Sequence, residues 1–366
     1  MLKVGIEIGD LLRLHRAGMA RYAGCLLSAL MSEGYDADIT GWASWRRFIG
    51  WPLRPAGSKL RFFGKSAPSR RADIFHATSC VFPEWKSATE IATVHDLFGI
   101  RDELNLTPHE VRLRTAYIHR ADRIICPSRF TQSQLHILLG VPASDTRVIP
   151  HAVSESFKPA TAEQKLHLRR RLGLPSEFLL FVGRDRWNKN LDRLVEAYAA
   201  SGLDLPLFIA GSQSKQPRER VIRTAHRFGC EHSLRWLGPV ADAQLPVLLS
   251  CASALCLPSI AEGFGLPILE AMACETAVVT SCGHATEEVA DGRAVLIDPL
   301  SVDSIAQGLH DVLNVNEAQR IEARAFATRR TWRDVAIETW RVYEGAAYAA
   351  PRTEDSAQRT FAVGRT

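Results

Sequence analysis

The sequence has no closely spaced cysteine pair that would mark a metal or redox site. Its eight cysteines form no Cys-x-x-Cys motif and most lie in apolar contexts, so we expect reduced, buried thiols and a cytoplasmic protein. A secretory signal is also missing, because Lys3, Glu7 and Asp10 interrupt the N-terminus before any long apolar segment. The longest uncharged run, residues 243–261, is broken by two prolines, which excludes a membrane-spanning helix there.

Two further absences narrow the class of protein. No Gly-x-Gly-x-x-Gly motif is present, so a nicotinamide dinucleotide site is unsupported, and no internal repeat is evident. The 366 residues, 46% apolar and 23% charged, suit a globular chain of two ordinary domains. The formal net charge of +5 is compatible with acidic substrates or anionic lipid and does not require a nucleic-acid partner.

Predicted strands and helices alternate along the chain, which indicates doubly wound α/β domains. The first pair is a strand at Val4–Ile8 and a helix over about residues 20–31. Ligands of this architecture bind beyond the carboxyl ends of the strands. Two prolines enclose residues 151–160, which we interpret as the interdomain linker. The predicted boundaries are therefore residues 1–155 for the N-terminal domain and 156–331 for the C-terminal domain.

The stretch Leu255–Cys274 predicts the most specific chemistry in the chain. A strand ends at Pro258, a glycine-bearing loop follows, and a helix begins with Pro267 in its first turn, where a missing N–H costs no helical bond. The N–H groups of such a helix N-terminus form an anion site. Glu262 and Glu270 frame this site, and carboxylates there suit a ligand that also has hydroxyls, as a nucleotide sugar does. The alternative is that Glu262 caps the helix and Glu270 faces water.

Two other strand ends carry candidate ligand-binding groups. Arg184 and Lys189 lie five residues apart between a strand and a helix, where an arginine can grip two oxygens of a diphosphate and a lysine adds a compact charge. The alternative is a solvated basic loop. His95 and Asp96 follow another buried strand, at a sheet edge where ligands bind in this architecture.

Residues 42–71 differ in composition from the rest of the chain. They contain eight arginines and lysines and six aromatic residues, with no acid from residue 46 to residue 71. Cations with tryptophans suit a lipid–water interface, where the cations meet anionic headgroups. An ordinary surface loop is the equal alternative, and single-stranded nucleic acid is a weaker one.

Several of these segments resemble one known family. Glu262-Gly-Phe-Gly-Leu-Pro267 followed by Leu269-Glu-Ala-Met-Ala273 closely resembles the signature of the retaining nucleotide-sugar glycosyltransferases of family 4. Thr93-Val-His95-Asp-Leu97 resembles the family's N-domain segment, and Arg184 and Lys189 match its donor-diphosphate pair. The resemblance covers nearly the whole chain.

This resemblance implies the GT-B fold, an α/β fold of two Rossmann-like, doubly wound domains that face each other across a cleft. The N-terminal domain would bind the acceptor and the C-terminal domain the nucleotide sugar. A helix over residues 332–350 would cross back and pack on the N-domain. The polar residues 351–366 are expected to be disordered.

The resemblance also implies a role for each candidate residue. Arg184, Lys189 and the backbone N–H groups of residues 263–266 would neutralise the departing diphosphate. Glu270 would hold the ribose hydroxyls, Glu262 the sugar hydroxyls, and His95 would contact the sugar from the facing domain. The remaining donor-binding candidates are Gly263, Phe264, Gly265, Leu266, Val240 beside the base, and Gly18 in a loop before the first helix.

The implied function is a retaining hexosyltransferase without a metal or other cofactor. The donor would be a nucleoside diphosphate sugar, with GDP-mannose favoured and UDP-sugars open. The acceptor would be a glycan or lipid-linked oligosaccharide of bacterial polysaccharide or lipopolysaccharide synthesis, with peripheral contact at the inner membrane face through residues 42–71. Two other classes stay open, an epimerase or hydrolase of nucleotide sugars on the same fold, and a non-catalytic sugar-nucleotide-binding protein.

Overall fold

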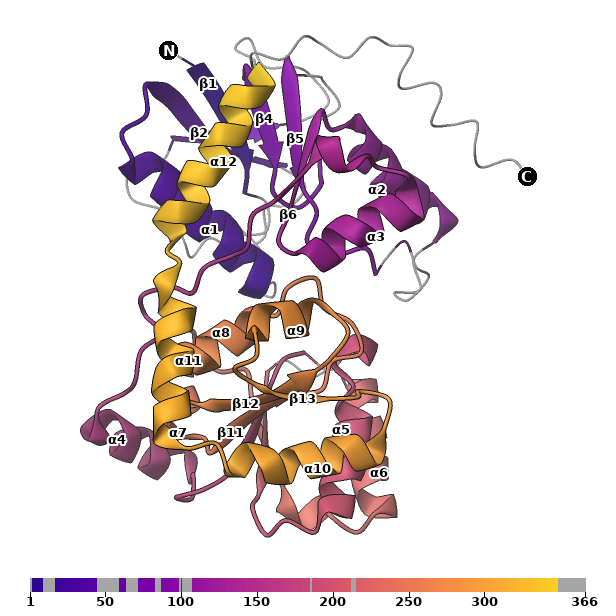
Figure 1. Cartoon of the computed structure of the whole chain (residues 1–366), viewed down its shortest axis with the longest axis vertical. Helices are drawn as coiled ribbons and strands as arrows, with labels where there is room; N and C mark the ends of the chain where they lie inside the picture. The colour runs from indigo at the N-terminus through magenta and orange to yellow at the C-terminus, as the bar shows by residue number, and fades with distance from the viewer. Residues whose placement is uncertain are drawn as a thin grey trace. The chain divides into compact units, whose positions relative to one another are not determined.

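The computed structural model of the chain forms two compact units (Figure 1). Unit 1 comprises Met1–His151 with Trp332–Thr366, and unit 2 comprises Ala152–Thr331. The first boundary therefore falls four residues before the predicted position at residue 155. The structure describes residues 2–8, 17–44, 59–63, 72–82, 87–98, 100, 107–184, 186–211 and 215–347. The predicted disordered tail, residues 351–366, lies outside these ranges.

Unit 1 is built on a seven-stranded parallel sheet of order β3-β2-β1-β4-β5-β6-β7. Its chain order reverses between β1 and β4, so the carboxyl ends of these two strands flank the topological switch point. The strands are β1 (Leu2–Glu7), β2 (Ala37–Ser44), β3 (Lys59–Phe63), β4 (Ile74–Ala77), β5 (Thr89–Thr93), β6 (Arg123–Cys126) and β7 (Thr146–Val148).

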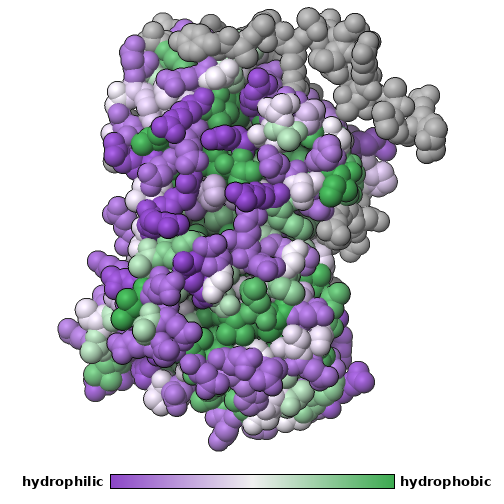
Figure 2. All heavy atoms as spheres, viewed as in Figure 1, coloured by the Kyte–Doolittle hydropathy of each residue, from purple (hydrophilic) through white to green (hydrophobic). Residues whose placement is uncertain are grey.

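The helices of unit 1 include one from the C-terminal end of the described chain. They are α1 (Ala17–Ser32), α2 (Pro108–Arg120), α3 (Arg129–Leu139), the short 3-10 turn η2 (Ala143–Asp145) and α12 (Trp332–Ala347). The α12 helix packs on α1 and turns an apolar side inward, where Tyr343 is fully buried and Trp340 stacks on Tyr35 at 4.0 Å. Figure 2 shows mostly hydrophilic residues along its outward side. This amphipathic pattern explains how a helix so distant in sequence joins unit 1.

Unit 2 is a six-stranded parallel sheet of order β10-β9-β8-β11-β12-β13. The strands are β8 (Leu179–Val182), β9 (Leu207–Ala210), β10 (Leu234–Gly238), β11 (Ala254–Leu257), β12 (Ala277–Ser281) and β13 (Val295–Ile297). The helices are α4 (Ala162–Leu172), α5 (Leu191–Ser201), α6 (Lys215–Arg227), α7 (Leu245–Cys251), α8 (Leu266–Ala273), α9 (Ala285–Ala290), α10 (Val302–Leu313) and α11 (Glu317–Arg329), with the 3-10 turns η3 (Trp187–Lys189) and η4 (Glu231–Ser233).

The strands of unit 2 bury side chains on both faces of the sheet, as parallel strands between two helix layers do. Leu179 and Phe181 of β8 join one core cluster, whereas Leu180 between them joins the cluster on the opposite face. The α8 helix is apolar nearly all round, with Ile268 and Ala271 fully buried. The position of α8 is therefore fixed by the core, and α8 in turn fixes the C-terminal end of the loop that precedes it.

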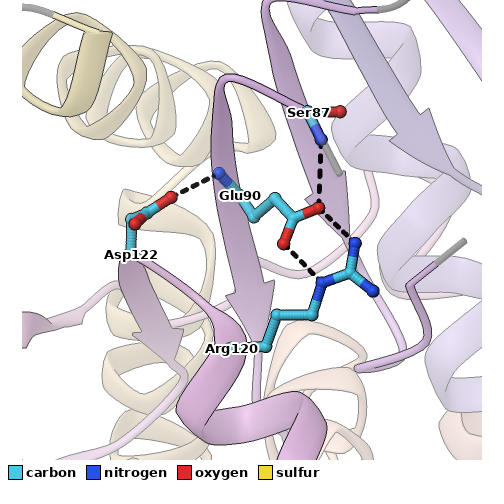
Figure 3. Close-up of polar contacts among 4 residues, drawn as sticks. All are labelled: Ser87, Glu90, Arg120 and Asp122. Carbon is cyan, nitrogen blue, oxygen red and sulfur yellow. Dashed lines mark hydrogen bonds and ion pairs between the residues drawn. The ribbon is translucent and has the colours of Figure 1, made fainter. Parts of the chain in front are cut away.

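A buried ion pair anchors β5 to α2 in unit 1. Glu90 is fully buried, and both of its carboxylate oxygens accept hydrogen bonds from Arg120 at 2.5 Å (Figure 3). The backbone N–H of Ser87 donates to Glu90 Oε1, and the backbone N–H of Glu90 donates to Asp122. This bidentate geometry compensates the desolvation of a buried carboxylate. It ties the amino end of β5 to the C-terminal end of α2.

Three features of the structure go beyond the sequence expectations. Part of the basic, aromatic stretch 42–71 forms β3, a strand at the edge of the unit 1 sheet, while residues 45–58 and 64–71 lie outside the described ranges. In the predicted linker, Ala152 and Phe157 are buried, with 1% and 3% of their surface exposed. The helix α11 was not expected. In the described ranges, no helix combines the length and the apolar composition needed to cross a bilayer.

Candidate functional site

The donor motif forms the predicted strand, loop and helix start. The β11 strand ends at Leu257, and α8 begins at Leu266 with Pro267 in its first turn. The residue before the helix, Gly265, has φ +107°, and an added Cβ would lie 3.0 Å from the Ile268 side chain. Glycine is therefore required there. It also has no side chain to accept the first N–H groups of the helix, which leaves this terminus suited to an anion.

Glu262 and Glu270 are both buried, with 9% and 2% of their surface exposed. The alternative in which Glu270 faces water is therefore wrong. Glu262 does not cap α8 either, because the N-cap residue is Gly265 and no described side chain accepts a capping hydrogen bond there. Glu262 Oε1 forms an ion pair with Lys189 Nζ and accepts a hydrogen bond from Ser259 Oγ at 2.8 Å. Burial raises the pKa of the Cys274 thiol to about 12, and the nearby negative charge of Glu270 in α8 contributes to this increase.

The contact between Lys189 and Glu262 was not expected, because their predicted roles concern different parts of a donor. The side chains are only 16% and 11% exposed, so the pair is mostly shielded from solvent. Lys189 lies in the η3 turn after β8, and Glu262 lies in the loop after β11, the neighbouring strand. The structure thus brings the side chain predicted to bind the diphosphate into direct contact with the side chain predicted to bind the sugar hydroxyls.

Two asparagines that flank Lys189 join these loops. Asn188 is 5% exposed and donates through Nδ2 to the Ala261 carbonyl at 2.9 Å, and its own carbonyl accepts from Ile260 N–H at 2.8 Å. Asn190, with φ +57°, donates to the Pro258 carbonyl at 3.0 Å. These buried bonds fix the Lys189 turn against the donor motif. Sequence reasoning missed these two asparagines, and the Asn-Lys-Asn run is the signal that could have indicated them.

Glycines at three neighbouring strand ends form the adjoining edge of the sheet. Gly183 follows β8, Gly211 follows β9, and Gly238 ends β10. Gly183 N–H donates to the Ala210 carbonyl at 2.9 Å, and Gly211 N–H donates to the Gly238 carbonyl at 2.8 Å. A Cβ on Gly211 would lie 2.0 Å from the Gly183 carbonyl oxygen, so the backbones approach too closely for any side chain. These glycines lie at the carboxyl ends of the strands, where ligands bind in this architecture.

The other predicted donor residues occupy varied positions in unit 2. Arg184 is half-buried directly after Gly183, in the same loop as Lys189. Phe264 is 8% exposed with its ring in the core, so it anchors the donor loop, while Gly263 is buried and Leu266 is half-buried. Val240 is half-buried two residues after β10 and packs on the same core cluster. Their contacts with a donor stay predictions.

The candidate residues of unit 1 lie near its own strand ends. His95 follows β5, is half-buried, and its Nε2 lies 2.9 Å from the Thr78 carbonyl oxygen. The Tyr22 ring meets the His95 ring edge-on at 4.8 Å, and the His151 ring lies 5.4 Å from it. Gly18 lies in the first turn of α1 rather than in the predicted loop, because the helix starts about three residues early. Its surroundings would accept a Cβ, so sterics do not require glycine there.

A buried polar network supports this region of unit 1. His76 is fully buried and bonds to Tyr343 Oη through Nδ1 and to Thr93 Oγ1 through Nε2, both at 2.7 Å. Thr93 Oγ1 also bonds to Tyr22 Oη at 2.9 Å. Burial, together with the nearby His95 charge, lowers the pKa of His76 to about 3, so its ring is neutral at physiological pH. The network joins β4, β5, α1 and α12.

Comparison with known sequences gives matches over both units. The family profile described as "Glycosyl transferases group 1" matches residues 165–327, and the profile "Glycosyltransferase Family 4" matches residues 17–157. O-antigen chain mannosyltransferase B of Escherichia coli is 26% identical over 283 residues, which cover 74% of each chain. Glycogen synthase of Mycobacterium tuberculosis is 28% identical over 325 residues, covering 83% of this chain and 76% of that protein. The serotype-specific mannosyltransferase WbdA of Escherichia coli is 29% identical over 221 residues, and this chain spans about a quarter (27%) of its length.

Solved structures share the whole fold at low sequence identity. Sucrose-phosphate synthase from Thermosynechococcus elongatus superposes with a TM-score of 0.76 at 18% identity, covering 94% of this chain and 99% of that one. Anabaena HepE in complex with UDP-glucose gives 0.75 at 16% identity, covering 94% and 100%. The prediction of the GT-B fold is confirmed, and the protein is a glycosyltransferase. The chain belongs to glycosyltransferase family 4.

Proposed function

We propose that this glycosyltransferase moves a hexose from a nucleoside diphosphate sugar to a hydroxyl of a glycan or lipid-linked acceptor, with retention of configuration and without a divalent ion. The observation that carries the proposal is the Lys189–Glu262 pair beside the glycine-capped start of α8. A cation, a carboxylate and a helix N-terminus in one place fit a ligand with both phosphate and hydroxyl groups.

The departing diphosphate is where negative charge develops in this reaction. Lys189, Arg184 and the backbone amides of the α8 start provide the compensating positive charge. The asparagine bonds that fix the Lys189 turn support this role, because preorganised charges need no reorganisation during the reaction. Cationic side chains and amides thus take the place that a metal ion has in other glycosyltransferases.

The two glutamates hold hydroxyl groups of the donor. Glu262 accepts hydrogen bonds from hydroxyls of the sugar and positions the anomeric carbon of that sugar. Glu270 accepts hydrogen bonds from the ribose hydroxyls. His95 contacts the transferred sugar from unit 1. In this proposal the acceptor attacks the face from which the diphosphate departs, within a short-lived ion pair, as the family resemblance implies.

Mannose is the proposed sugar and GDP the proposed nucleotide, supported by the O-antigen and serotype-specific mannosyltransferases among the relatives. These names also support bacterial polysaccharide or lipopolysaccharide synthesis as the pathway. A UDP-sugar is the second candidate, favoured by the fold shared with HepE, which was solved with UDP-glucose. Contact with the inner membrane face through residues 42–71 belongs to the proposal as well, although most of these residues lie outside the described ranges.

A donor panel tests this proposal. The protein is incubated with GDP-mannose, UDP-glucose and other common nucleotide sugars in EDTA, and nucleotide release is measured with the K189A variant as the control. Release from one donor in EDTA, lost in K189A, is expected. Proton NMR recorded before the released hexose mutarotates should then show the anomeric configuration of the donor. Release that requires added Mg²⁺ contradicts the metal-free mechanism, epimerised donor indicates an epimerase, and binding without any release indicates a non-catalytic protein.

A further inference from the structure

Glu7 is a fully buried carboxylate that no proposed role explains. It ends β1, and the neighbouring strand β4 continues into Thr78 and Ser79, so these residues flank the switch point of the unit 1 sheet. A carboxylate with no exposed surface needs strong donors to stay charged. Glu7 Oε2 accepts from Ser79 Oγ at 2.6 Å and from Ser79 N–H at 3.2 Å, and Thr78 Oγ1 lies 3.2 Å from it.

These bonds hold a tight turn after β4. Cys80 N–H donates to the Ala77 carbonyl at 3.3 Å, and Cys80 has φ +57°, a conformation that residues other than glycine rarely adopt. Thr78 Oγ1 also donates to the backbone carbonyl of Glu7, which ties the turn to the end of β1. The shape of the turn therefore depends on Glu7.

The turn after β4 determines the orientation and the tautomer of the His95 ring. The Thr78 carbonyl oxygen lies 2.9 Å from His95 Nε2, and a carbonyl can only accept, so Nε2 carries the proton. In the neutral ring Nδ1 is then the acceptor nitrogen. Tyr22 limits the ring laterally by its edge contact at 4.8 Å. Both the orientation and the tautomer of His95 thus follow from the turn that Glu7 holds.

We propose that Glu7 is a positioning residue for the transfer reaction: through the Thr78–Ser79 turn it keeps His95 in the Nε2–H tautomer, so that Nδ1 accepts a hydroxyl of the transferred hexose. The inference rests on the proposed function, in which His95 contacts that sugar. Glu7 itself is buried and acts only through His95.

The test compares E7Q with E90Q in the full chain. Glu90 is also fully buried in a strand of the same sheet, but it lies at the amino end of β5, away from His95. Donor turnover is measured at temperatures where both variants are folded. We expect E7Q to lower kcat about 10- to 100-fold with little change in KM, and E90Q to keep the wild-type kcat. Equal losses in both variants, or an unchanged kcat in E7Q, would overturn the proposal.

A spectroscopic arm reads the tautomer without relying on activity. Nitrogen NMR of protein labelled with ¹⁵N-histidine distinguishes Nε2–H from Nδ1–H rings, and H95Q assigns the His95 signals by difference. The expected result is Nε2–H in the wild type and in E90Q, with a shift toward Nδ1–H in E7Q. An Nδ1–H ring in the wild type overturns the positioning role. If H95Q keeps full turnover while K189A loses it, the sugar contact of His95 is wrong and the Glu7 role falls with it, but the donor site stands.

Discussion

Replacement of Glu262 by glutamine should strengthen the binding of nucleoside diphosphate while it weakens transfer. The Lys189 ammonium is bound to Glu262, and the two side chains are only 16% and 11% exposed. If Lys189 is to meet a diphosphate, its attraction to Glu262 opposes that contact. Glutamine keeps the size of the side chain and can still accept from Ser259 Oγ, but it no longer holds the cation.

The size of the effect follows from the partial burial of the pair. Two unit charges about 4 Å apart attract by roughly 4 kcal/mol at an effective dielectric constant of about 20. Water and the remaining dipoles recover part of this energy when the pair separates, so we expect E262Q to gain about 1–2 kcal/mol in diphosphate binding. That gain corresponds to about a 5- to 30-fold lower Kd. The turnover number should fall about 100-fold, because a proposed acceptor for the sugar hydroxyls is lost.

Calorimetric titration with GDP and with UDP in EDTA measures this prediction. The matched control is E275Q, since Glu275 pairs with Arg324 at 2.8 Å on the surface of the same unit and should leave the Kd unchanged. In a K189A background E262Q should give much less gain, which a double-mutant cycle detects. A Kd in E262Q equal to or higher than that of the wild type would refute the reasoning.

Three other substitutions test separate parts of the account. K189A should lower kcat/KM for the donor about 100- to 1,000-fold, measured by nucleotide release, because a charge-assisted contact to the leaving group is lost; a change below about threefold would argue against the diphosphate role. The pKa of His76 is about 3 when folded against 6.5 when unfolded, so the unfolded chain binds more protons between these values and stability falls as pH drops below about 6.5. From pH 7 to pH 5 this loss is about 2 kcal/mol, and H76Q should reduce the pH dependence of the free energy of unfolding, measured by urea denaturation, by that amount. An unaltered pH dependence would exclude His76 as the source. G211A should destabilise the protein by about 3 kcal/mol or more in thermal unfolding, because the new Cβ would overlap the Gly183 carbonyl. The control G229A, also at positive φ but with open space around it, should cost only about 1 kcal/mol. Equal melting temperatures of the two variants would contradict the steric argument.

The features that the sequence predicted are those that local chemistry determines. The start of α8 follows from Gly265 and Pro267, whose backbone preferences act within a few residues. Such signals need no knowledge of the tertiary structure.

The features that were missed depend on contacts between distant residues. Lys189 and Glu262 are 73 residues apart, and only the adjacency of β8 and β11 brings their loops together. Glu7 was interpreted as an ordinary charged residue, because its burial depends on Ser79, which lies in the turn after β4, a strand that is its neighbour only in space. The strand Lys59–Phe63 alternates polar and apolar residues at first, but its basic composition favoured a surface or lipid-facing loop.

The most direct test of the central claim is a crystal structure of the protein with its nucleoside diphosphate sugar. We expect a diphosphate in contact with Lys189 Nζ and the backbone amides at the start of α8, with no metal ion bridging it to the protein. A diphosphate bound elsewhere in the chain, or one that reaches the protein only through a divalent ion, would contradict it.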